Sequence, residues 1–156
     1  MDRKREELKK LKAGDFSIFT KTVTETDVML YAGLSGEMNP YYLNDVYAEP
    51  KLGQAMISAA QLQALAGGAI FRLLPEGSIR IQGEYRLVKP ALRGETIIAR
   101  AEILKVDEEK GTIAIAWECY SNDKELLIEG KSLEQLLSRH RDVQDIFKEE
   151  SQHGDP

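Results

Sequence analysis

The chain has 156 residues, of which 42% are hydrophobic and 30% are charged, and this length and composition suit one domain with its own core. A formal net charge of −5 argues against nucleic-acid binding, which depends largely on neutralised phosphates. The single cysteine, Cys119, excludes an intrachain disulfide and any multi-cysteine metal site, and we expect no metal.

Residues 1–12 form a charged N-terminal segment without the apolar run of a secretory signal, so we expect a cytoplasmic protein. The alternating residues 16–23 predict a short strand. Thr24 and Asp27 then form a capping-box pattern, and the apolar spacing that follows predicts an amphipathic helix.

A loop rich in helix-breaking residues follows, with the sequence SGEMNPYYLND at residues 35–45. Gly36, Asn39 and Pro40 end the preceding helix and favour a structured turn. Glu37 places a carboxylate inside this turn, and we expect the chemistry of the protein to lie here.

Residues 52–71 contain no charged side chain. Their number would suit a membrane span, but the segment carries glutamines and glycines and lacks flanking aromatic or basic clusters. We therefore predict a long helix over about residues 55–74 that is buried within the domain.

Alternating apolar residues at 79–87, 97–103, 113–119 and 126–128 predict four further strands. The polar connections between them indicate antiparallel pairing. The helix at 55–74 is apolar enough to cover the resulting sheet, so we predict an α+β fold with one curved antiparallel sheet wrapped around one long helix.

The end of the chain is predicted to be helical. Ser132 and Gln135 resemble a helix cap, and leucines at helical spacing predict an amphipathic C-terminal helix over residues 132–148. The polar residues 149–156 are expected to form a disordered tail.

Two segments of the predicted domain, residues 13–131, carry a family resemblance. TETDVMLYAGLSGEMNPYYLNDVYAEPKLG (residues 24–53) and YRLVKPALRGET (residues 85–96) resemble, in this order, signature segments of the MaoC-like (R)-specific enoyl-CoA hydratases. The resemblance covers about residues 16–132 and implies a single hot-dog fold. That family's helix ends in Ser-Gly-Asp-x-Asn-Pro-x-His, which aligns Glu37 with the aspartate and Tyr42 with the histidine.

The family resemblance also implies an activity. These enzymes add water to an enoyl thioester of coenzyme A or acyl carrier protein, or remove it, and a backbone N–H stabilises the thioester oxygen. Coenzyme A then enters as part of the substrate, and no separate cofactor is expected. By this resemblance the catalytic groups are Glu37, Tyr42 and the N–H of Ala59, and the substrate-binding residues are Asn39, Pro40, Ser58, Gly67, Arg86 and Lys89.

The sequence leaves three functions open, because a tyrosine with its usual pKa of about 10 is not a base at neutral pH. The first is an acyl-thioester hydratase or dehydratase that relies on Glu37. The second is a non-catalytic acyl-CoA-binding subunit or sensor, and the third is a hot-dog thioesterase. We expect no membrane association and a homodimer or higher oligomer, or a heteromer with a catalytic hot-dog subunit.

Overall fold

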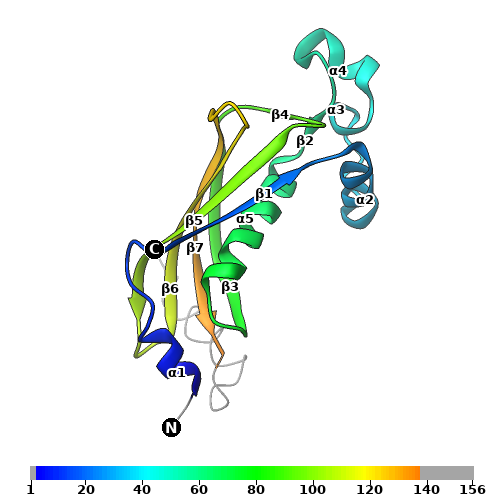
Figure 1. Cartoon of the computed structure of the whole chain (residues 1–156). Coiled ribbons are helices and arrows are strands. Elements are labelled where there is room, and N and C mark those ends of the chain that lie inside the picture. The colour runs from blue at the N-terminus through cyan, green and yellow to red at the C-terminus, as the bar shows by residue number, and fades with distance from the viewer. Residues whose placement is uncertain (1–2, 138–156) are drawn as a thin grey trace, which may run out of the picture.

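The computed structural model describes residues 3–137 (Figure 1). Along the chain the elements are α1 (Arg3–Leu8), β1 (Phe16–Thr22), α2 (Glu25–Ser35), α3 (Pro40–Leu43), α4 (Asp45–Leu52), β2 (Met56–Ile57), α5 (Ala59–Leu73), β3 (Ser78–Leu87), β4 (Ala91–Leu92), β5 (Thr96–Asp107), β6 (Thr112–Tyr120) and β7 (Leu126–Leu136).

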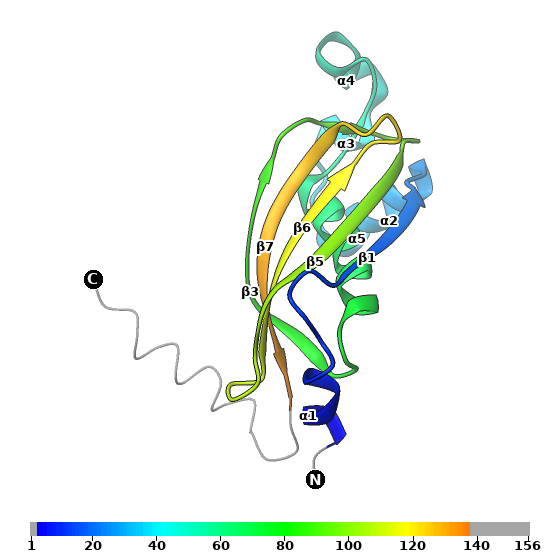
Figure 2. The same ribbon diagram turned by 60° about the vertical axis from the view of Figure 1, so that its left-hand side comes forward.

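One curved antiparallel sheet wraps around α5 (Figures 1 and 2). Its strands lie in the order β1-β5-β6-β7-β3, and β2 pairs separately with β4. Along β6 every second residue is buried, because alternate side chains of a strand point to opposite faces. The buried face covers α5, which confirms the predicted α+β, hot-dog arrangement.

The central helix is buried as predicted, but it begins four residues later than expected. Met56 and Ile57 pair with β4 instead, and Ser58 is the N-cap, its Oγ accepting a hydrogen bond from the Gln61 N–H at 3.1 Å. Leu62 is fully buried beneath the sheet. Within residues 3–137, no helix is long and apolar enough to cross a membrane.

Helices α2, α3 and α4 gather at one end of the sheet (Figure 1). The predicted capping box is present, since Thr24 and Asp27 each bond the backbone N–H of the other. Arg93, in the turn before β5, forms ion pairs with Glu25 of α2 and Asp45 of α4. These contacts tie both helices to the sheet beside the start of α5.

The prediction of a helix that opens at Ser132 is wrong, because β7 continues through Leu136 between β3 and β6. Glu134 points inward there and is only 4% exposed. Arg80 pairs with its carboxylate at 2.8 Å, and the Ser132 hydroxyl donates to it at 2.8 Å. The remainder of that predicted helix and the predicted tail, residues 138–156, lie outside the described residues.

The charged N-terminal segment is joined to the domain. Leu8 of α1 is buried in the core, and Leu11 packs against it.

Candidate active site

Helices α2 and α3 and the first turn of α5 meet around a small void. Its empty space is too narrow for a water molecule. The residues that line it are Val28, Tyr31, Ala32, Glu37, Tyr42, Ser58 and Gln61. The structure therefore brings together Glu37, Tyr42 and Ser58, three of the residues that the sequence singled out.

The turn between α2 and α3 sets the positions of Glu37 and Tyr42. Gly36 ends α2 with φ of 74°, a left-handed conformation that favours glycine. Asn39 caps α3 by accepting from the Tyr41 N–H at 3.0 Å, and Pro40 is the first helical residue. Tyr42 follows within α3, and its hydroxyl lies close enough to the Glu37 carboxylate for that group to influence its pKa.

The environment of Tyr42 keeps its hydroxyl protonated. Burial raises the pKa of Tyr42 above its ordinary value of 10.0, and the charge of Glu37 and the hydrogen bond to it raise it further. Smaller contributions come from Tyr85 and Tyr31. Tyr42 is therefore a hydrogen-bond donor at neutral pH.

The first turn of α5 adds backbone donors beside the void. Ser58 is 3% exposed and lines the void, and Ala59 is the first residue of the helix. The first N–H groups of a helix have no acceptor within it and lie at the positive end of its dipole. Ala59 itself is not among the residues that line the void, although it follows Ser58, which is.

Gln61 is a lining residue that the sequence analysis missed. It is 8% exposed, and its Nε2 donates to the Asp27 carbonyl at 3.1 Å. Among residues 3–137, its Oε1 is buried without a hydrogen-bond partner. The available signal was a polar residue three positions after the N-cap, within the uncharged stretch at residues 52–71.

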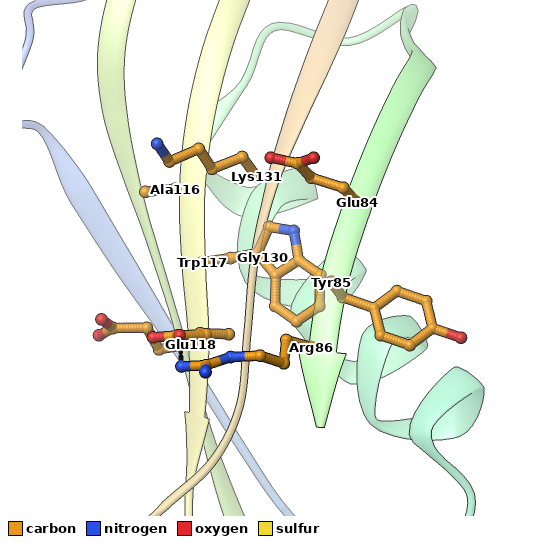
Figure 3. A pocket seen from close by; sticks show the side chains of 9 residues that line it. Glu84, Tyr85, Arg86, Ala116, Trp117, Glu118, Gly130 and Lys131 are labelled. Carbon is orange, nitrogen blue, oxygen red and sulfur yellow. Dashed lines mark hydrogen bonds and ion pairs between the residues drawn. The ribbon is translucent and has the colours of Figure 1, made fainter. Parts of the chain in front are cut away.

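Arg86 and Lys89 do not reach the void. Figure 3 shows Tyr85 and Arg86 leaving β3 in opposite directions, and Arg86 pairs with Glu129 at 2.6 Å on the outer face of the sheet. Lys89 pairs with Glu125 at 2.5 Å. Gly67, farther along α5, is also not among the lining residues.

A larger pocket of about 410 Å³ lies on the sheet away from Glu37 (Figure 3). Arg86, Glu118, Glu129 and Lys131 line it, and these side chains alternate with the buried ones of their strands. It is an open, charged depression of the outer face. Within the described part of the chain, no three His, Cys, Asp or Glu side chains are grouped to hold a metal ion.

Comparison with known proteins gives several likenesses, although no family model matches the sequence. An (R)-specific enoyl-CoA hydratase of Rhodospirillum rubrum is 28% identical over 134 residues, which cover 83% of this chain and 90% of that protein. The solved structure of an (R)-hydratase from A. caviae involved in PHA biosynthesis has a TM-score of 0.77 at 22% identity, covering 82% of this chain and 98% of the other.

A two-component protein shares the same fold. The C-terminally truncated HadBC complex of Mycobacterium tuberculosis, a 3R-hydroxyacyl-ACP dehydratase, contains a chain with a TM-score of 0.67 at 17% identity, covering 81% of this chain and 98% of the other. These likenesses in structure extend over more than four fifths of this chain and show that it shares their fold.

Proposed function

We propose that this chain, a protein of the MaoC-like hot-dog family, is a hydratase or dehydratase of acyl thioesters carried by coenzyme A or acyl carrier protein. The observation that carries the proposal is the meeting of Glu37, Tyr42 and the first turn of α5 around one void. Coenzyme A would enter as part of the substrate, without a separate cofactor.

In the hydration direction, Glu37 is the base. Its carboxylate takes one proton from water while the water oxygen bonds to C3 of the enoyl thioester. Negative charge develops on the thioester oxygen, where the Ala59 N–H and the dipole of α5 stabilise it. The protonated Glu37 then delivers its proton to C2, which completes the addition and restores the carboxylate.

Tyr42 orients the base in this mechanism. Its phenol can donate to Glu37 and so limit the directions in which the carboxylate can point. Glu37 is otherwise exposed, so its side chain can rotate and widen the void for substrate. Dehydration follows the same steps in reverse.

A non-catalytic acyl-thioester binder is the second candidate. The observation that favours it is that the void beside Glu37 and Tyr42 has no room for a water molecule. Such a subunit would depend on a partner for the acid-base pair.

The decisive experiment measures hydration of a four-carbon enoyl-CoA by loss of its ultraviolet absorbance. Lack of one acid-base partner costs about 100- to 10,000-fold in rate, so we expect slow but measurable hydration by the native chain. Glu37→Gln should abolish this rate while leaving thioester affinity, measured by calorimetry, nearly unchanged. Glu108→Gln, an exposed carboxylate in the turn between β5 and β6, is the matched control.

The double change Glu37→Asp with Tyr42→His should raise the rate by about two to four powers of ten, since it restores the family's pair. If this variant binds the thioester but stays inactive, the hydratase proposal fails and the binder replaces it. Release of free thiol without hydration would instead identify a thioesterase.

A further inference from the structure

The orientation of the Gln61 side chain is fixed by a contact across the site. Its Nε2 donates to the Asp27 carbonyl at 3.1 Å, and a carbonyl oxygen can only accept. The amide nitrogen must therefore face Asp27, and Oε1 is directed away from that carbonyl. Asp27 is itself held in place by the capping box with Thr24.

The free oxygen of Gln61 belongs to a residue that lines the same void as Glu37 and Tyr42. Glu37 can only accept hydrogen bonds as a carboxylate, and the Tyr42 hydroxyl can donate to it. The Ser58 hydroxyl oxygen accepts from the Gln61 N–H at 3.1 Å. Glu37 and Gln61 therefore supply two acceptors among the residues that line the void, and an oxygen that carries hydrogen atoms can donate to both once rotation of the Glu37 side chain widens the space.

We infer that Gln61 Oε1 accepts a hydrogen bond from the oxygen atom that is added to, or removed from, C3 of the acyl thioester. This inference rests on the proposed function. Water would donate one hydrogen to Glu37 and the other to Gln61, and its lone pair would point toward C3. An amide cannot take up the proton, so Gln61 orients the water and Glu37 removes its proton.

The same contact serves the reverse reaction. A 3-hydroxyl group has one hydrogen, and it donates that hydrogen to Gln61 while the leaving oxygen receives its second proton from Glu37. The hydrogen bond to Gln61 is kept from the bound 3-hydroxyacyl thioester to the released water. A ligand with a 3-hydroxyl group should therefore bind more tightly than the same acyl thioester without that hydroxyl.

The first test is Gln61→Met, which keeps an unbranched side chain of similar length but removes the amide oxygen. The hydration kcat should fall about 10- to 100-fold, while KM for the enoyl-CoA, which has no hydroxyl, should change less than about threefold. Gln63→Met is the matched control, because Gln63 lies on the same helix and does not line the void. It should retain the native rate, and melting temperatures of both variants check folding.

The second test is Gln61→Glu, which distinguishes a role of Gln61 in orienting the water from a purely structural role of this residue. Desolvation and the Glu37 charge should raise the pKa of the introduced carboxyl, with Tyr42 and Tyr31 as its other titratable neighbours in the void. The protonated acid can donate to the Asp27 carbonyl and accept from water, as the amide does. Its activity should therefore increase as the pH falls through this raised pKa, relative to the native profile, whereas a purely structural role would leave the shape of the profile unchanged.

The third test uses calorimetry with (R)-3-hydroxybutyryl-CoA and butyryl-CoA. The native chain should bind the hydroxylated ligand about 5- to 50-fold more tightly, and Gln61→Met should lose this preference. A native rate in Gln61→Met, or an unchanged hydroxyl preference, would overturn the inference and leave the proposed function intact.

Two further outcomes separate the inference from the function on which it rests. If the native chain binds thioesters without turning them over, the proposal of a hydratase fails. The role of Gln61 is then decided by calorimetry alone, through whether Gln61→Met loses the preference for the hydroxylated ligand. If the native chain binds neither ligand, both proposals fall.

Discussion

The protonation of Tyr42 decides which side chain of the candidate site can act as a base. Burial, followed by the charge and hydrogen bond of Glu37, raises the pKa of this phenol above its unfolded value. A group whose folded pKa is raised stabilises the fold fully below the unfolded pKa, here about 10. This contribution is lost as the pH rises through the folded pKa, so it is complete at neutral pH.

An ultraviolet titration checks this arrangement without any substrate. Subtracting the phenolate absorbance of Tyr42→Phe from that of the native chain isolates Tyr42, whose pKa should lie above the ordinary value of 10.0. Glu37→Gln should lower this pKa, since it removes the neighbouring charge. The difference is needed because the chain has six tyrosines, and a hydrogen bond to Glu118 raises the pKa of Tyr120 to about 12. Titration of Tyr42 at or below the ordinary value would contradict the Glu37 contact.

The sequence predicted the residues of the site that belong to one continuous motif. Glu37 and Tyr42 lie five positions apart around Asn39 and Pro40, and this local chemistry fixes the turn. Gln61 was missed because its role depends on the carbonyl of Asp27, which is 34 residues away. A hydrogen bond between two helices leaves no periodic signal in the sequence.

Close packing of neighbouring strands supports the sheet beside the site. The Trp117 side chain of β6 is 1% exposed, and its indole crosses β7 at Gly130 with Tyr85 of β3 beyond it (Figure 3). The Trp117 and Tyr85 ring centroids are 6.4 Å apart. A Cβ at position 130 would lie 2.3 Å from Trp117 Cζ2 and 2.5 Å from the Glu84 carbonyl oxygen, so no side chain fits there.

Gly130→Ala should therefore lower the free energy of unfolding by about 3 kcal/mol, because the indole and the strand must both move. Gly83→Ala is the matched control in the adjacent strand, since its Cβ would meet only ordinary contacts, the nearest at 3.5 Å from Arg80 Cδ. Urea denaturation followed by the fluorescence of Trp117, the chain's one tryptophan, measures both variants. Equal stability of the two variants would show that the indole does not lie over Gly130.

Strand periodicity was informative where each strand has one buried face, as in β5 and β6. It was misleading in β7, where the spacing of Leu133, Leu136 and Leu137 also fits a helix. Residues 132–136 form a strand because they pair with β3 and β6 and because Arg80 neutralises the buried Glu134. These partners are distant in the sequence, and local propensity cannot report them.

At the scale of the whole molecule, β3 is an edge strand of the described sheet, and within residues 3–137 it pairs on one side only, with β7. The C-terminal end of β3 and the residue after it carry large apolar side chains that are partly exposed, namely Tyr85 (45%), Leu87 (37%) and Val88 (46%). A long, exposed edge with apolar side chains is a template for pairing with another chain. The polar backbone groups and the apolar surface of β3 would both be covered by a second copy.

We therefore predict at least a dimer in which β3 is protected. Light scattering at micromolar concentration should give at least twice the 17.5 kDa mass of the chain. Hydrogen exchange localises the contact, because β3 amides should exchange slowly in the assembly and faster on dilution. Amides of the central strand β6, which pairs on both sides, serve as the reference and should not depend on concentration in this range. A monomer whose β3 amides exchange rapidly at all concentrations would refute the prediction. A dimer with unprotected β3 amides would show that the interface lies on another surface.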